Sequence, residues 1–67
     1  MTGLEIKRRN AGLTIAELSA KSGVSAPTII KIEAGRIRTV KVDSLYKLAD
    51  ALGCDVTDFF NLTVNIY

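Results

Sequence analysis

Residues 13–35 read LTIAELSAKSGVSAPTIIKIEAG, and this stretch decides the fold of the chain. Glu17 follows Thr14 by three residues, the spacing of a capping box in which side chains and backbone cap each other at a helix start. Gly23 comes just after the short helix that this cap predicts, at a turn where a positive φ angle costs glycine least. The segment Ser25–Pro27 predicts a second start, because serine is a favoured N-cap and proline suits the first turn. The stretch therefore predicts two short helices joined by a tight turn.

Helix signals continue on both sides of this stretch. A capping box at residues 2–5 predicts a helix from about Gly3 to Asn10. Asp43 is expected to cap a helix whose apolar residues follow the i, i+3, i+4, i+7 pattern up to Gly53. Asp55 is expected to cap a final helical turn. We therefore expect an all-α fold of five helices, with a core that includes Leu18, Val24, Ile29 and Ile32.

The last six residues have a different pattern. Residues 62–67 alternate apolar and polar side chains, which is typical of a β-strand, and no other segment reads as a partner for it. Pairing with the same strand of a second copy would satisfy its backbone; the alternatives are a frayed tail or a tail folded back on the helices. We expect a helical domain over residues 1–61 and a dimerisation tail over residues 62–67. The expected dimer contacts are Phe59, Phe60, Leu62, Val64 and Ile66.

Composition limits the possible functions. The 67 residues are 48% hydrophobic and 24% charged, which suits one small domain. With no His and a single Cys, the chain offers neither an internal disulfide nor a Cys/His metal site, and we expect no metal and no cofactor. No serine has an evident general base, so an enzyme is not expected. The chain carries no membrane-length apolar run and no signal-peptide pattern, which predicts a cytoplasmic protein away from membranes.

Charge is unevenly distributed along the chain. Residues 1–41 hold eight Lys and Arg against three Glu, whereas residues 42–67 hold one Lys against four Asp. The net charge of +2 hides this division. It suggests that the first part of the chain faces a polyanion and that the second part faces away from it.

The order of these landmarks resembles the lambda-repressor-like family, also called the Cro or Xre type. The resemblance covers roughly residues 4–60. It implies a compact five-helix helix-turn-helix domain that binds double-stranded DNA, usually as a dimeric transcriptional regulator. The landmarks are Arg8, Gly12–Thr14, Glu17–Leu18, Gly23–Ser25, Ile29, Ile32–Gly35 and Leu45–Gly53.

The resemblance implies that the helix at 26–34 enters the major groove. Its implied base-reading residues are Ala26, Pro27, Ile30 and Lys31. They share about 140° of a helical wheel, opposite the core positions. Only Lys31 can donate a hydrogen bond to a base edge, such as guanine O6 or N7. Ile30 offers apolar contact to thymine methyl groups, unless it is a singly exposed side chain without a role or a contact for a protein partner.

The resemblance also implies contacts with DNA phosphates. The loop after the helix at 26–34 would follow the sugar-phosphate backbone, and it is basic; the alternative is a solvated charged loop. At Ile15 many relatives carry a phosphate-binding Gln, so only the backbone amides and helix dipole remain there. The expected phosphate contacts are Thr14, Ile15, Ser25, Thr28, Arg36, Arg38, Thr39 and Lys41. A buried ion pair between Arg8 and Glu33 is implied as structural support.

These implications together predict a sequence-specific transcriptional regulator. The expected role is that of a repressor that binds a pseudo-palindromic operator as a homodimer. Two other classes stay open: a protein-interaction module that uses the apolar face around Ile30 for an unknown protein partner, and an antitoxin-like or phage-switch component on the same scaffold.

Overall fold

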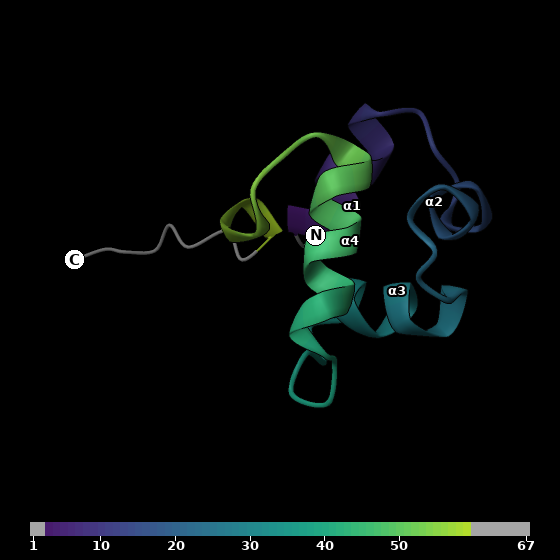
Figure 1. Ribbon diagram of the computed structural model, residues 1–67. Coiled ribbons are helices and arrows are strands. Elements are labelled where there is room, and N and C mark those ends of the chain that lie inside the picture. The colour runs from purple at the N-terminus through teal and green to yellow at the C-terminus, as the bar shows by residue number, and fades with distance from the viewer. Residues whose placement is uncertain (1–2, 60–67) are drawn as a thin grey trace.

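The computed structural model describes residues 3–59 as four α-helices followed by a 3₁₀ turn (Figure 1). The helices α2 and α3 lie to one side of α4, and the turn η1 lies to the other. The all-α prediction is confirmed. A fifth α-helix is not, because the segment expected to form it is the 3₁₀ turn, and the expected strand at 62–67 lies outside the described residues. The elements are α1 (Gly3–Asn10), α2 (Ile15–Ser22), α3 (Ala26–Glu33), α4 (Val42–Leu52) and η1 (Val56–Phe59).

The capping box of α2 forms as the sequence predicts. The amide of Glu17 donates to Thr14 Oγ1 at 3.1 Å, and the amide of Thr14 donates to Glu17 Oε1 at 2.8 Å. The helix ends at Gly23, which adopts a left-handed conformation with φ 79° and donates its N–H to Ser19 O at 2.9 Å. Both ends of this eight-residue helix are therefore closed by local hydrogen bonds.

Two predicted caps are wrong, and a third is confirmed only in its position. Ser25 occupies the N-cap position of α3 as predicted, but its hydroxyl lies 2.9 Å from the hydroxyl of Thr28 and makes no capping hydrogen bond. Asp43 lies inside the first turn of α4, where it pairs with Lys47 at 3.2 Å, and Lys41 occupies the N-cap position. Asp55 was expected to cap η1 with its side chain. Instead, the Asp58 carboxylate accepts a hydrogen bond from the backbone amide of Asp55 at 3.1 Å.

One apolar core joins all five elements. The side chains of Leu4, Leu18, Ile29 and Leu48 are fully buried. Burying a side chain of this size stabilises the fold by about 1.5–3 kcal/mol. Phe59 is 5% exposed and belongs to the same core, so its expected role in a dimer contact is corrected.

Helix α1 begins directly against the backbone of η1. A Cβ added at Gly3 would lie 2.7 Å from the carbonyl carbon of Phe59 and would overlap the carbonyl oxygen of Asp58. Only glycine allows so close an approach of two backbone segments. The first and last described elements are thus packed together, and η1 lies on the side of α4 away from α2 and α3 (Figure 1).

Candidate nucleic-acid interface

Helix α3 buries one face and exposes the other. Ile29 and Ile32 are 0% and 4% exposed, whereas Ile30 is 53% exposed. Pro27 and Lys31 are also exposed, and Ala26 is half-buried. The helical wheel predicted this division, because 100° per residue places core and surface positions on opposite sides. The outward face therefore carries one cation, Lys31, among apolar side chains.

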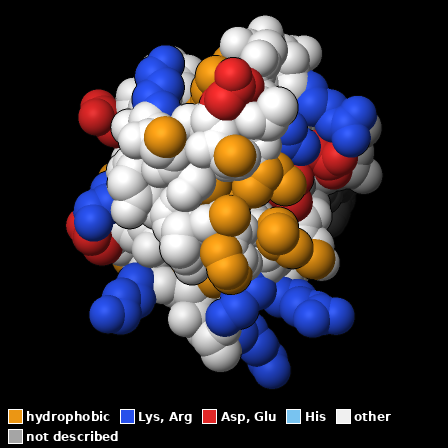
Figure 2. Space-filling model, turned by 90° about the vertical axis from the view of Figure 1, so that its right-hand side faces the viewer, with side chains coloured by type: hydrophobic (Ala, Val, Ile, Leu, Met, Phe, Trp, Pro, Cys, Tyr) orange, Lys and Arg blue, Asp and Glu red, His pale blue; other side chains and the backbone are white. Residues whose placement is uncertain are grey.

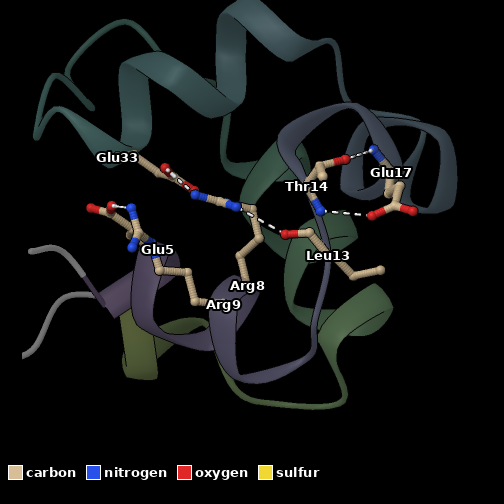
Figure 3. Close-up of polar contacts among 7 residues, drawn as sticks. All are labelled: Glu5, Arg8, Arg9, Leu13, Thr14, Glu17 and Glu33. Carbon is tan, nitrogen blue, oxygen red and sulfur yellow. Dashed lines mark hydrogen bonds and ion pairs between the residues drawn. The ribbon is translucent and has the colours of Figure 1, made fainter.

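A buried ion pair holds the end of α3 against α1. Arg8 Nε lies 2.7 Å from Glu33 Oε2, and Arg8 Nη2 lies 3.3 Å from Glu33 Oε1 (Figure 3). Arg8 Nη1 donates to the carbonyl oxygen of Leu13 at 2.9 Å. The hydrogen bond to Glu33 raises the pKa of Arg8 further above its ordinary value. One guanidinium thus connects α1, the segment before α2 and the C-terminal end of α3.

The chain reverses at the end of α3 through a Schellman motif. Gly35 has φ 83° and donates its N–H to Ile32 O at 3.0 Å, and Arg36 donates its N–H to Lys31 O at 2.9 Å. This pattern of bonds defines the motif and satisfies carbonyl groups that the helix end leaves unpaired. It also places the backbone of Arg36 within hydrogen-bond distance of the backbone of Lys31, which lies five residues earlier in the chain. A hollow of about 490 Å³ opens there, lined by Lys31, Gly35, Arg36, Arg38 and Thr39.

The loop between α3 and α4 carries its cations on the surface. Arg36, Arg38 and Lys41 are exposed, and Thr39 is exposed beside them. Figure 2 shows the side of the molecule formed by α2 and α3, with apolar side chains in its middle and Lys and Arg side chains along its lower edge. The expected base-reading residues therefore lie on α3, and the expected phosphate-binding cations lie on the loop that directly follows it.

The N-termini of α2 and α3 offer less than the sequence suggests. Thr14 is exposed, but its amide and hydroxyl already serve the capping box, and the Glu17 carboxylate adds a negative charge there. The Ile15 side chain packs against the core, so only its backbone amide can face a phosphate. Ser25 and Thr28 present adjacent hydroxyl groups at the start of α3.

Residues 3–59 contain no group of three or more His, Cys, Asp or Glu side chains placed to hold a metal ion. Within the same range, no helix has the length and apolar character needed to cross a bilayer. Cys54 is half-buried against the core, and burial, followed by the nearby Asp58 charge, raises the pKa of its thiol. A raised pKa keeps the thiol protonated and a poor nucleophile.

Two helices at a tight turn, the second with an exposed face beside a basic loop, define a DNA-binding helix-turn-helix domain. A family model described as helix-turn-helix matches residues 4–59, and the chain belongs to this family, which is of the Cro/C1 type. The lambda-repressor-like resemblance is thereby confirmed. Domains of this family are DNA-binding and regulatory rather than enzymatic. Neither a curated protein nor a solved structure gives a significant match.

Proposed function

We propose that the chain is a sequence-specific repressor that binds operator DNA by placing α3 in the major groove. The observation that carries this proposal is the outward face of α3, with exposed Ile30 and Lys31, continued directly by the exposed cations of the next loop. A helix of this width fits the major groove, and cations at its edge meet the flanking phosphates.

The four base-reading positions would divide into polar and apolar contacts. Lys31 would donate to guanine O6 or N7, because it is the only one of the four with a hydrogen-bond donor in its side chain. Ile30, Pro27 and Ala26 would contact thymine methyl groups. Ala26 is half-buried and carries only a methyl group, so the duplex could approach the start of α3 closely. Specificity in this arrangement rests mainly on Lys31 and Ile30.

Phosphate contacts would flank these positions on both sides. Arg36, Arg38 and Lys41 would neutralise phosphates after α3, with Thr39 adding a hydroxyl. Before α3, the hydroxyl groups of Ser25 and Thr28 would meet the opposite backbone, together with Thr14 and the Ile15 amide. Such contacts set the position of the protein on DNA without reading its sequence.

We also propose that two copies bind together. Residues Phe60, Leu62, Val64 and Ile66 would form the dimer contact, with the tail strands paired across a two-fold axis. Half-sites would then lie about one helical turn apart, 34–36 Å, on a pseudo-palindromic operator. The acidic second part of the chain would face away from DNA, as expected of a cytoplasmic regulator with a basic binding face.

The salt dependence of DNA binding tests the proposal. Arg38→Ala and Lys41→Ala should each weaken binding to every duplex alike and reduce the slope of log K against log salt by about one. Lys21→Ala removes the same charge from the last turn of α2 and serves as the control, for which the slope should not change. Fluorescence anisotropy titrations at several salt concentrations measure the slope. If neither loop variant differs from Lys21→Ala, the loop does not contact phosphates.

The exposure of Ile30 favours one other candidate, a module that binds a protein through the same face. An apolar side chain on an exposed helix face can anchor the helix in a hydrophobic groove of a partner protein. Binding of such a partner would be nearly insensitive to salt, whereas DNA binding falls steeply as salt rises. The titrations above therefore separate the two functions.

A further inference from the structure

The hollow at the end of α3 is larger than a contact with one DNA phosphate requires. Its volume of about 490 Å³ lies within the range of pockets that bind small molecules, roughly 300–1,000 Å³. A phosphate group would occupy only a part of it. The space above Gly35 is open, because a Cβ added there would meet no atom within 4 Å.

Three cations surround this hollow without a carboxylate beside them. The ion pairs among residues 3–59 join Arg8 with Glu33, Arg9 with Glu5, and Lys47 with Asp43. Lys31, Arg36 and Arg38 take part in none of them, so their charges are available to a ligand. The Schellman motif holds the backbone of Lys31 and Arg36 together at the edge of this hollow.

The chemistry of the lining suits a phosphate ester. Guanidinium groups bind phosphate oxygens with paired hydrogen bonds, and the Thr39 hydroxyl can donate another. The methylene stems of Lys31, Arg36 and Arg38 supply apolar wall below the charged ends. A guanidinium plane also stacks on an aromatic ring, so a nucleobase attached to the phosphate has a surface to lie on.

We infer that this hollow binds a small phosphate ester of nucleotide size, and that the bound ester competes with DNA. The competition rests on the proposed function, because Lys31 would contact a base and the two arginines would contact phosphates in the DNA complex. These side chains cannot serve both ligands at once. By linkage, a ligand that binds only the DNA-free protein lowers the apparent affinity for DNA.

Binding to the hollow can be measured on the full chain by NMR. The probes are adenosine 5′-monophosphate, inorganic phosphate and adenosine. The monophosphate should cause saturable amide shifts over residues 35–39, inorganic phosphate should bind the same site more weakly, and adenosine should leave these amides unchanged. No saturable shift over these residues with the monophosphate would overturn the inference.

Variants separate a built site from general attraction between charges. Thr39→Val keeps the charge and shape but removes the hydroxyl, and should weaken binding of the monophosphate by roughly 2- to 10-fold. Arg36→Ala should weaken it by about tenfold or more. Lys21→Ala removes one charge elsewhere and should leave the affinity within about twofold. An equal loss in Lys21→Ala and Arg36→Ala would show that only net charge matters, and would overturn the inference.

A competition experiment distinguishes this inference from the proposed function. Adenosine 5′-monophosphate should displace fluorescent duplex DNA with an inhibition constant equal to its NMR-derived dissociation constant, and the inhibition constant for Arg36→Ala, calculated with that variant's own DNA affinity, should be about tenfold higher. DNA binding without monophosphate binding would mean that the hollow accepts only backbone phosphate; the repressor would stand and the inference would fall. Monophosphate binding by a chain that binds no DNA would uphold the site and overturn the proposed function.

Discussion

Arg8 is a buried charged side chain that joins three segments of the described domain. It is 9% exposed, and its three nitrogens reach Glu33 and the carbonyl of Leu13 from a single guanidinium. A buried ion pair adds little net stability when both partners are present, because desolvation offsets their attraction. Loss of one partner is costly, since the other charge stays buried and unpaired. The pair therefore holds α3 in place more than it strengthens the fold.

Arg8→Met should destabilise the domain by about 3–5 kcal/mol, because the Glu33 carboxylate would lose its counter-charge. Arg9→Met is the matched control, since the Arg9 side chain is 60% exposed and its pair with Glu5 lies on the surface. That variant should change the free energy of unfolding by less than about 1 kcal/mol. Urea denaturation followed by circular dichroism measures both. Equal unfolding midpoints for the two variants would contradict a supporting role for Arg8.

Individual contacts mark the limit of what the sequence predicts. The Arg8–Glu33 pair follows from the family resemblance, and the structure contains it. The third partner, the carbonyl of Leu13, has no signature in a sequence because every residue has one. Ser25 occupies the N-cap position of α3, but its hydroxyl contacts the hydroxyl of Thr28 and caps no backbone amide. The sequence pattern predicts a dimer contact for Phe59, whereas the structure places it in the core. A pattern cannot distinguish an aromatic residue that packs in its own core from one that contacts another chain.

At the scale of elements, short helices depend on their ends and on the core. Three of the four helices have eight residues, too few to be stable alone in water. The glycine turns and the apolar spacing predict the ends of helices α1 to α3. The individual N-cap side chains are predicted less well, because at the starts of α2, α3 and α4 only Thr14 makes the expected hydrogen bond. Asp43 was misplaced because an acidic residue is favourable throughout the first turn, not only at the N-cap. The sequence does not predict the hollow beside Gly35, because the hollow depends on how the turn places side chains in space.

Thr14→Ala should cost about 1 kcal/mol of stability, because it removes the hydroxyl that caps α2. Ser25→Ala offers a natural comparison, since the Ser25 hydroxyl caps no backbone group and its loss should cost only a few tenths of a kcal/mol. Thermal unfolding of both variants by calorimetry gives the difference. A larger loss for Ser25→Ala than for Thr14→Ala would contradict the hydrogen bonding at these two helix starts.

For the whole molecule, the arrangement divides the elements around α4. Helices α2 and α3 lie on one side of α4, and η1, against which Gly3 packs, lies on the other (Figure 1). Residues 3–59 share one apolar core that joins all five elements. The proposed dimer would use the segment after Phe59. A dimer formed through that segment would present two copies of α3 to the same side of a duplex.

Deletion of residues 62–67 should produce a monomer that still unfolds cooperatively, because the core lies within residues 3–59. The shortened chain should bind a two-site operator much more weakly than the full chain, yet bind a single half-site equally well. Sedimentation equilibrium measures the oligomeric state. A full chain that is monomeric at micromolar concentrations, or a shortened chain that remains dimeric, would remove the tail from the dimer interface.

Lys31 offers the most direct test of whether α3 reads DNA sequence. A duplex selected from a random library and a second duplex with its critical guanine replaced are titrated with the wild type and with Lys31→Ala. The wild type should prefer the selected duplex, and Lys31→Ala should lose about 1–3 kcal/mol of that preference. If Lys31→Ala weakens both duplexes equally, Lys31 only neutralises phosphate and α3 does not read bases through it.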